Sequence, residues 1–441
     1  MAQRGIREYD AKRILARNWK EYFGDEFEYD FKSILITPET DLDKVPEEHP
    51  WVLETPLVAK PDMLFGKRGK LGLVLYKKEK PGDVTWEDVK AWIKEKMGQE
   101  IEIKGVKGKL THFIVEPFVP HEQEEEYYVA ISMGDSGDKV YMSAFGGIDV
   151  EENWDKVKEV EIPVLASDEE AAKLIEENVP EEIKDKKTYA EFVKRLYKYF
   201  KDLHFAYLEI NPIVIKGKKV YPLDMVARLD DTAQFVAGRK WGEVTFPAGF
   251  GRELTPEEKY IKELDEKSGA SLKLTILNPE GRVWLLIAGG GASVVYADTV
   301  ADLGFVKELA NYGEYSGNPS RTETREYVKT LFDLMTREKH KSGKPKILII
   351  GGAIANFTDV AKTFEGIIDA MKEYADKLRE VGVKIYVRRG GPNYEIGLQR
   401  IKQAAEELGL PIEVYGPETH MTEIVKKALV DDEKAEAQAG A

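Results

Sequence analysis

The sequence predicts an α/β protein whose second half is a doubly wound parallel sheet. Residues 241–257 carry Pro and Gly with little periodicity, and beyond them short apolar runs alternate with segments of helical spacing, the strand–helix order of such a sheet. The apolar runs, expected to be strands, are residues 282–288, 346–350, 384–387 and 411–415. The helices that follow them are expected to begin at Ser293, Asn356, about Glu395 and Thr422.

The first half is expected to form a separate α/β domain. Apolar residues at helical spacing predict helices at residues 9–23, 86–97 and 189–199. Strands are expected at residues 33–36, 57–60, 113–119, 127–133 and at the apolar end of the glycine-rich stretch 66–76. The segments LEINPIVI and KVYPLDM, joined by a turn at 216–219, favour a hairpin. We expect domains at 1–245 and 246–430, with the small, polar residues 431–441 as a disordered tail.

Composition excludes several classes of function. Of the 441 residues, 65 are Lys or Arg and 80 are Asp or Glu, and the net charge of −15 argues against nucleic acid or an anionic membrane as the main partner. The absence of cysteine rules out disulfides, zinc–thiolate sites and a cysteine nucleophile. The first residues have no apolar signal-peptide core, and no segment has the apolar length needed to span a bilayer. These features indicate a cytoplasmic protein.

Basic residues and glycines gather near the end of the expected strand 57–60. Lys60 closes that strand, and the segment GKRGK that follows at 66–70 includes Arg68. Cations beside a mobile glycine loop suit a polyphosphate, but the Walker A pattern is absent, so the loop is not a P-loop. Ordinary solvated lysines in a loop explain the pattern equally well.

Three oxygen-bearing side chains lie on the expected hairpin. Glu209 and Asn211 are two residues apart and so share a face of one strand, while Asp224 lies on the strand expected to pair with it. Their oxygens could converge on Mg²⁺, which takes few protein ligands and shares the rest with water and phosphate. Alternatively, Asn211 precedes a proline and only makes a turn, and Asp224 is a surface charge.

The second half contains three strand–glycine–helix connections, at residues 282–298, 347–358 and 387–397. Backbone N–H groups and the positive end of the helix dipole make such a turn an anion site, although each glycine turn is also explained as a tight connection. The segment GGGASV departs from the GxGxxG dinucleotide pattern. Arg388 and Arg389 end the third strand, where ligands of α/β sheets bind, and an arginine fork suits a carboxylate.

Nucleophilic catalysis finds little support in this chain. There is no GxSxG elbow, and the histidines have no metal-ligand spacing. Two of the histidines, His121 and His420, lie in candidate functional loops. A covalent carrier, if the chemistry requires one, is expected from another chain.

Several long motifs carry a resemblance to a known family: LVAKPD, KRGKLGLV, IVEPFVPH, YLEINPIV, DEKSGASLKLTILNP, AGGGASVVYADT, ANYGEYSG, IGGAIANFTDV and RRGGPN. From about Leu15 to Leu429 the chain resembles the citrate-binding, ATP-grasp half of ATP-citrate lyase, which is related to the β subunit of succinyl-CoA synthetase. The resemblance implies an ATP-grasp domain followed by a flavodoxin-like sheet of the CoA-ligase type. Because the sequence ends soon after Leu429, we expect the smaller subunit of a two-subunit enzyme.

The resemblance implies a nucleotide site in the first half and a citrate site in the second. The nucleotide and metal residues are Lys60, Arg68 and Gly69 for phosphates, the backbone at Pro117 and Val119 for adenine, Glu126 for ribose, Asn211 and Asp224 for Mg²⁺, and Glu209 beside the phosphoryl-transfer site. The citrate residues are Gly290, Gly291, Ala292, Ser293, Gly317, Asn356, Thr358, Tyr374 and Arg389. Asp265, Ser268 and Ala270 match a further metal-associated segment of the family.

The implied reaction uses a partner subunit. ATP phosphorylates a histidine of that partner, leaving ADP, and phosphoryl transfer to citrate and attack by CoA give citryl-CoA. A citrate-synthase-like domain, also on the partner, then releases acetyl-CoA and oxaloacetate. Three alternatives stay open: the large subunit of citryl-CoA synthetase, a succinate-type acid–CoA ligase, and a non-catalytic sensing subunit.

Overall fold

The computed structural model describes residues 3–150, 153–353 and 357–431. The chain divides between Glu253 and Leu254 into two compact units, which we call unit 1 and unit 2. The helix start expected at Asn356 and, apart from Asp431, the tail expected at 431–441 lie outside the described residues. None of the helices formed by the described residues combines the length and apolar character needed to cross a bilayer.

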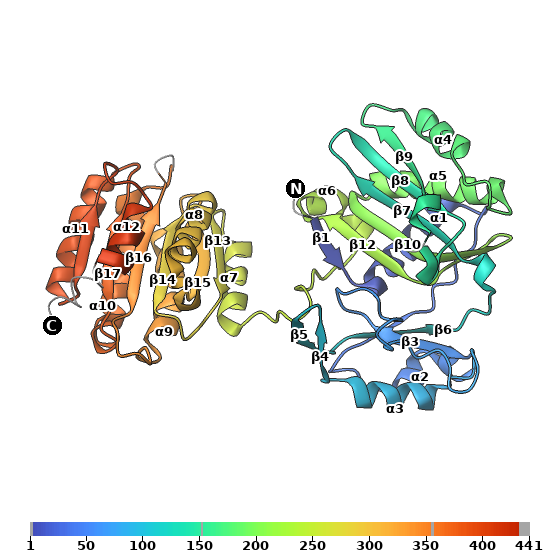
Figure 1. Cartoon of the computed structure of the whole chain (residues 1–441), viewed down its shortest axis with the longest axis horizontal. Helices are drawn as coiled ribbons and strands as arrows, with labels where there is room; N and C mark the ends of the chain where they lie inside the picture. The colour runs from blue at the N-terminus through green and yellow to red at the C-terminus, as the bar shows by residue number, and fades with distance from the viewer. Residues whose placement is uncertain (1–2, 151–152, 354–356, 432–441) are drawn as a thin grey trace. The chain divides into compact units, whose positions relative to one another are not determined.

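The larger sheet of unit 1 is antiparallel (Figure 1). Its strands, in spatial order, are β1 (Gln3–Ile6), β12 (Met225–Asp230), β10 (Phe205–Lys216), β7 (Tyr127–Met133), β8 (Gly137–Ser143) and β9 (Lys158–Pro163). The expected hairpin is confirmed, since β11 (Lys219–Pro222) pairs with β10. The core of this sheet includes α1 (Glu8–Phe23) and α5 (Lys186–Asp202), whose Phe23 and Phe192 rings stack at 5.3 Å.

A smaller antiparallel sheet of unit 1 has the order β2 (Ile34–Ile36), β6 (Phe113–Pro117), β3 (Leu57–Pro61). The helix α3 (Trp86–Lys96) packs on it through the edge-on contact of Trp92 with Phe113. Two further strands, β4 (Glu100–Ile103) and β5 (Val106–Lys109), pair only with each other among the described residues.

The prediction of a strand at the apolar end of residues 66–76 is wrong. That segment is a loop with one isolated bridge, between Leu75 and Ala59. Leu73 is buried, but Leu71 and Tyr76 are 44% and 36% exposed. The apolar residues of this segment are therefore not all buried, as those of an inner strand would be.

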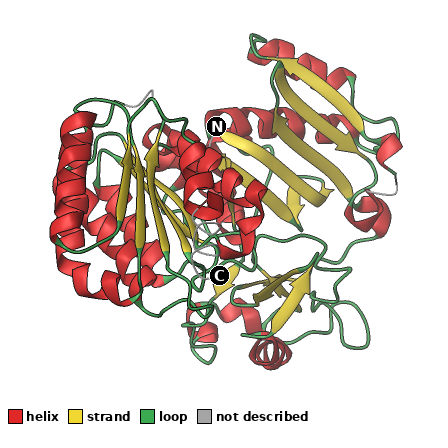
Figure 2. Cartoon of the chain, turned by 60° about the vertical axis from the view of Figure 1, so that its left-hand side comes forward, coloured by secondary structure: helices red, strands yellow, loops and turns green. Residues whose placement is uncertain are grey.

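Unit 2 is built on a six-stranded sheet with helices on both faces (Figure 2). Its strands, in spatial order, are β13 (Ser271–Ile276), β15 (Asn311–Ser316), β14 (Val283–Ala288), β16 (Ile347–Gly352), β17 (Lys384–Arg388) and β18 (Ile412–Tyr415). Neighbours from β15 to β18 are parallel, as expected, whereas the edge strand β13 runs antiparallel to β15.

The side chains of β14 alternate between two apolar cores, because successive residues of a strand point to opposite faces. Trp284 and Leu286 join the core formed with α7 (Pro256–Lys267), α9 (Arg321–Thr336), α10 (Val360–Glu380) and α11 (Tyr394–Glu407). Leu285 and Ile287 join the core formed with α8 (Gly290–Val300) and α12 (Glu423–Lys426). Burial on both faces explains why β14 and β16 are uninterrupted apolar runs.

Two helix starts in unit 2 differ from expectation. The helix α8 begins at Gly290 rather than at Ser293, directly after Gly289, whose φ of 99° favours glycine. Within the described residues, the helix α10 begins at Val360, four residues after the expected position, because Asp359 caps it by accepting the N–H of Lys362. Thr358 therefore precedes the helix.

Candidate functional site

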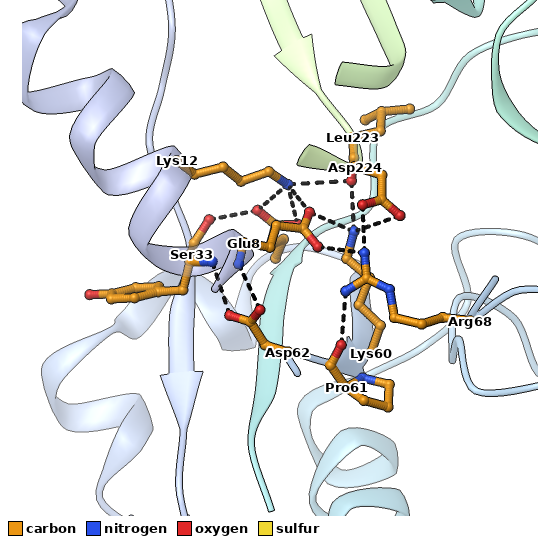
Figure 3. A network of polar contacts seen from close by, with 11 residues as sticks. Glu8, Lys12, Ser33, Lys60, Pro61, Asp62, Arg68, Leu223 and Asp224 are labelled. Atoms are coloured by element: carbon orange, nitrogen blue, oxygen red, sulfur yellow. Dashed lines mark hydrogen bonds and ion pairs between the residues drawn. The ribbon is translucent and has the colours of Figure 1, made fainter. Parts of the chain in front are cut away.

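The two cations expected to hold phosphates, Lys60 and Arg68, lie together in a buried ionic network of unit 1 (Figure 3). The Lys60 ammonium donates to Oε1 of Glu8 at 2.7 Å and to the carbonyl of Leu223 at 2.8 Å. Arg68 donates to the carbonyl of Pro61 at 2.8 Å and pairs with Oε2 of Glu8 at 2.8 Å. Leu223, from the hairpin segment KVYPLDM, thus contacts Lys60. These hydrogen bonds and ion pairs hold both cations in fixed positions.

Sequence reasoning missed four acids and bases of this network: Glu8, Lys12, Asp62 and Glu116. Burial acts to raise the pKa of Glu8, but the charges of Lys12, Lys60 and Arg68 hold it well below its usual range. The only local signal was the spacing of Glu8 and Lys12, four residues apart on one face of a helix, which is ordinarily a solvent-exposed pair.

Of the expected metal ligands, Asp224 faces the cations. One of its oxygens accepts from Arg68, and the other lies 3.9 Å from the Lys60 ammonium. The Asp224 side chain keeps 34% of its surface exposed, so a ligand can reach it. Asn211 lies beside it, since the Asn211 N–H donates to the Asp224 carbonyl at 2.9 Å.

The Asn211 side chain turns toward Gly147, whose N–H donates to its Oδ1 at 2.6 Å. Asn211 and Pro212 lie within β10, so they do not form a chain-reversing turn. Asp224 lies in the bend between β11 and β12, and not on the strand paired with β10 as expected. Its carboxylate and the Asn211 amide oxygen of β10 are a donor set that Mg²⁺ accepts, with water and phosphate completing its shell. The described residues contain no group of three or more His, Cys, Asp or Glu that could bind a metal alone.

Glu209 is half-buried on β10, two residues before Asn211. The Tyr207 hydroxyl donates to Glu209 Oε2. Burial raises the pKa of Tyr207 well above its usual value, and the charge of Glu209 adds to the shift. Tyr207 therefore stays a neutral donor that fixes one oxygen of Glu209.

The residues expected to face adenine and ribose lie between β6 and β7. Pro117 ends β6, and the Val119 carbonyl contacts His121 Nδ1 at 2.7 Å. The other ring nitrogen of His121 lies 2.9 Å from Glu126 Oε1. A Cβ at Gly147 would lie 2.2 Å from Glu126 Oε2, so Glu126 and Asn211 both approach the same glycine.

The expected phosphate loop is open at Gly69, where an added Cβ would meet no atom within 4 Å. Lys67 has a φ of 62° and starts the turn, and Gly72 has a φ of 67°. The N–H groups of Leu71 and Gly72 donate back to Lys67 and Gly69, so the loop is compact and hydrogen-bonded.

In unit 2, the first glycine turn is fixed by Ser293 and Glu314. The Ser293 hydroxyl is fully buried and donates to the Gly313 carbonyl of β15. A Cβ at Gly290 would lie 3.1 Å from a Glu314 oxygen, whereas Gly291 is open. The N–H groups of Gly290, Gly291 and Ala292 stand in the first turn of α8, where backbone donors have no partner within the helix.

Arg389 is the most unusual side chain of unit 2. Its exposed fraction is 0%, and among the described residues none of its three guanidinium nitrogens has a hydrogen-bond acceptor. A Cβ at Gly352 would lie 2.2 Å from its Nη1, so the end of β16 must be glycine for the guanidinium to fit. The buried hydroxyl of Tyr315 also has no hydrogen-bond partner among the described residues. Burial lowers the pKa of Arg389 below its ordinary value.

Arg388 has a different environment from Arg389. Its nitrogens donate to three carbonyls, of Gly352 at 2.9 Å, Pro417 at 3.2 Å and Thr419 at 2.8 Å. The hydrogen bonds of Arg388 therefore link the end of β16 to the loop after β18, and of the two arginines it is Arg389 that is available to an anion. His420 follows Thr419 in that loop and contacts Thr422 at 2.8 Å.

Asp359 joins the turns at the same edge of the sheet. Besides capping α10, it accepts from the Asn393 side chain at 2.6 Å, and its N–H donates to Asn318 at 3.4 Å. Thr358 precedes it and is fully buried. Gly317, with a φ of 72°, precedes Asn318 and would place a Cβ 3.1 Å from Ala270. Asn356 lies outside the described residues.

Two groups of expected residues, Tyr374 and the metal-associated segment with Asp265, Ser268 and Ala270, make other contacts. Tyr374 lies fourteen residues into α10, about 21 Å from the helix start at 1.5 Å per residue, and packs on Phe332 at 6.1 Å. Asp265 pairs with Lys273 and accepts the Leu272 N–H at 2.8 Å. Ser268 donates to Glu323 of α9 at 2.7 Å and accepts the Ala270 N–H at 3.0 Å, so these groups already have partners within the protein.

Comparison with known proteins gives matches over both units. Residues 2–241 match the family described as the ATP-citrate synthase ATP-grasp domain, and residues 252–431 match the family described as ATP citrate lyase citrate-binding. ATP-citrate synthase alpha chain protein 2 of Arabidopsis thaliana is 49% identical over 431 residues, which are 97% of this chain and 98% of that protein. ATP-citrate synthase of Homo sapiens is 50% identical over 401 residues, 90% of this chain and 36% of that protein.

A solved structure has the same fold over nearly the whole chain. The ATP citrate lyase of Methanothrix soehngenii, determined with citrate and coenzyme A, is 52% identical with a TM-score of 0.88, covering 97% of this chain and 100% of that one. A variant ATP citrate lyase of Methanosaeta concilii, determined with (3S)-citryl-CoA, is 50% identical with a TM-score of 0.87 and the same coverage.

Proposed function

Because this chain belongs to the ATP-citrate synthase family, we propose that it is the ATP- and citrate-binding subunit of an ATP-citrate lyase. The complete reaction converts citrate, ATP and CoA to acetyl-CoA, oxaloacetate, ADP and phosphate. The near-complete coverage of an alpha chain from Arabidopsis thaliana supports a separate subunit of this kind. In this proposal, residues 1–245 bind nucleotide and residues 246–430 bind citrate.

Unit 1 activates the γ-phosphate of ATP. Lys60, Arg68 and the open backbone at Gly69 hold the phosphates, while Pro117, Val119 and Glu126 face adenine and ribose. Asn211 and Asp224 would hold Mg²⁺, which offsets the negative charge that develops during phosphoryl transfer. Glu209, oriented by the Tyr207 hydroxyl, stands beside the phosphoryl group and positions the histidine that receives it.

Unit 2 binds citrate, and Arg389 carries this proposal. Its buried guanidinium has no acceptor among the described residues, which is costly unless a ligand supplies one, and its planar fork matches a carboxylate. The N–H groups of Gly290, Gly291 and Ala292, in the first turn of α8, are placed for further carboxylate oxygens, whereas the Ser293 N–H donates to the Gly289 carbonyl. Gly317, Thr358 and Asn356 complete the site in the proposal, and Tyr374 is left out because of its position on α10.

The remaining chemistry belongs to a partner. The partner subunit supplies the histidine that carries phosphate from unit 1 to citrate, and a citrate-synthase-like domain that cleaves citryl-CoA after CoA attack. The enzyme is then a hetero-oligomer with CoA as a co-substrate. A cytoplasmic location is supported by the absence of cysteine from the sequence. If the partner lacks the citrate-synthase-like domain, the product is citryl-CoA.

Ligand-dependent thermal unfolding of the full chain tests the citrate assignment. Citrate is expected to raise the unfolding midpoint, and succinate to leave it unchanged. Arg389→Gln should weaken citrate binding about 10- to 100-fold, the value of a charge-assisted hydrogen bond. Arg400→Gln is the matched control, because this arginine is 52% exposed and pairs with Glu365. Stabilisation by succinate and not by citrate would refute the proposal.

A further inference from the structure

We propose that Glu8 is a positioning residue of the nucleotide site: it holds Lys60 and Arg68 in place for phosphate so that Asp224 can leave them for a metal ion. The inference rests on the proposed function of unit 1 and deepens it. Glu8 lies far from the loop and the hairpin in the sequence, yet its carboxylate touches both cations.

The start of α1 is fixed to the strand that carries Lys60. The N–H groups of Glu8 and Tyr9, the first two residues of the helix, donate to the two oxygens of Asp62 at 2.7 and 2.9 Å. Asp62 directly follows β3, which contains Lys60. The side chain of Glu8 is 2% exposed, so its carboxylate has one environment and one direction.

Each oxygen of Glu8 is committed to the cations (Figure 3). Oε1 lies 2.7 Å from the ammonium of Lys60 and 2.7 Å from that of Lys12, and Oε2 lies 2.8 Å from the guanidinium of Arg68. Lys12 has a second acid, Glu116, whose oxygens lie 2.8 and 2.9 Å away. Glu8 is therefore shared by three cations, and of these Lys12 also pairs with Glu116.

Among the described residues, both cations also contact the carboxylate of Asp224. The two acids differ in exposure, 2% for Glu8 and 34% for Asp224. Only Asp224 can be reached by an ion from solvent without unfolding the network. When Asp224 turns to a metal, Glu8 still pairs with Lys60 and Arg68 and keeps both at the site.

Without the charge of Glu8, Asp224 would be the acid that neutralises both buried cations. A divalent ion would then compete with Lys60 and Arg68 for the same oxygens, and removing Asp224 from two buried charges is costly. The consequence is specific: the concentration of Mg²⁺ needed for ATP binding rises. A role limited to packing would lower stability and leave this requirement unchanged.

The test is ATP binding to the full chain, measured by calorimetry over a series of Mg²⁺ concentrations. Glu8→Gln keeps the shape of the side chain and removes its charge, and should raise the half-saturating Mg²⁺ concentration about tenfold, the scale of one charged hydrogen bond. Citrate binding by the same variant reports on unit 2 and should match the wild type. Folding of unit 1, which contains Glu8, is verified by comparing the thermal unfolding transition of the variant with that of the wild type. Glu8→Asp keeps the charge on a stem one methylene shorter, and should give a smaller rise.

Glu159→Gln is the matched control, since Glu159 is a 48% exposed acid on β9 of unit 1 that pairs with Lys139, outside the ionic network. A change below threefold is expected there. If Glu8→Gln is folded and its Mg²⁺ requirement is unchanged or lower, the inference is overturned. Should only Glu8→Asp fold, a wild-type requirement in that variant overturns it. Failure of the wild-type chain to bind ATP at any Mg²⁺ concentration would refute the proposed function itself.

Discussion

Arg68 and Asp224, 156 residues apart in the sequence, form an ion pair in which the guanidinium is 7% exposed and the carboxylate 34%. The basic loop after β3 and the turn before β12 therefore meet at one point. There Arg68, proposed to bind phosphate, and Asp224, proposed to bind the metal, neutralise each other's charge. Binding of Mg-ATP would replace this ion pair with a contact of Arg68 to phosphate and a contact of Asp224 to the metal.

Replacing Asp224 by Ala should abolish the use of ATP without affecting citrate. Phosphorylation of the partner's histidine should fall by about a hundredfold or more, because the metal loses its charged ligand and the lost charge stabilisation amounts to several kcal/mol. The measurement is transfer of radiolabelled phosphate from ATP, beside citrate binding to the same protein. Unchanged transfer would show that Asp224 is not a metal ligand.

Replacing Tyr207 by Phe should slow phosphoryl transfer by about tenfold, since Glu209 loses the hydroxyl that fixes one of its oxygens. The KM for ATP should stay within twofold, because Tyr207 contacts Glu209 and not the proposed phosphate cations. Steady-state kinetics with the partner present separates the two constants. Tyr221→Phe on β11 is the control, and an equal loss in both variants would contradict the assignment.

Replacing Gly352 by Ala should weaken citrate binding by at least about tenfold. The added methyl carbon would lie 2.2 Å from Nη1 of Arg389, so the guanidinium must move from its place. Calorimetric titration with citrate measures the loss, and ATP binding reports on the rest of the chain. Gly249→Ala adds a methyl group in open space and should have no effect on citrate. Wild-type citrate affinity in Gly352→Ala would show that Arg389 does not contact the ligand.

The contact of His121 with Glu126 should make part of the stability of unit 1 depend on pH. The hydrogen bond to Glu126 raises the pKa of His121 above its usual value, against the effect of burial. A raised pKa in the folded state means that the stabilising contribution is present below pH 6.5 and is lost as the pH rises through the folded value. The contribution should stay below about 1 kcal/mol, since the pair is partly exposed.

The variant His121→Asn should therefore lower the unfolding midpoint at pH 5.5 more than at pH 8.5. His340→Asn is the control, because burial lowers the pKa of His340 and so gives no stabilisation at low pH. A larger effect of His121→Asn at pH 8.5 than at pH 5.5 would contradict the direction of the shift.

Local patterns were sufficient to predict four of the six strands in the sheet of unit 2, whereas β13 and β15 were not predicted. The apolar runs of β14 and β16 end at glycines, and both the strand and its turn depend on neighbouring residues, so a single sequence contains the information. The segment at 66–76 shows the limit of this reasoning. Its leucines and valine predicted a strand, but their burial depends on β3, a partner that the local pattern does not specify.

The ionic network of unit 1 could not be predicted in the same way. Glu8 meets Lys60 across 52 residues, and Lys12 meets Glu116 across 104. Nothing near Glu8 distinguishes it from an exposed acid at the start of a helix, where acids are common for reasons of the helix dipole. Only the fold shows that this end of α1 is enclosed.

For the adjacent residues Arg388 and Arg389, too, the sequence alone does not show which side chain can bind a ligand. Both were expected at the edge of the sheet, and both are there, fully enclosed. Successive residues of an extended chain point in opposite directions, so one meets three carbonyls and the other meets none among the described residues. The sequence supplies the pair, and the packing decides which member is available to a ligand.

The enclosed guanidinium of Arg389 also has a consequence for the lifetime of the chain. A buried charge without an acceptor raises the free energy of the folded state, and an anion that pairs with it lowers that free energy again. At a ligand concentration one hundred times the dissociation constant, the gain is about 2.7 kcal/mol, which reduces the unfolded fraction roughly a hundredfold. Proteases degrade unfolded chains, so the abundance of this subunit would follow the supply of the anion that Arg389 binds.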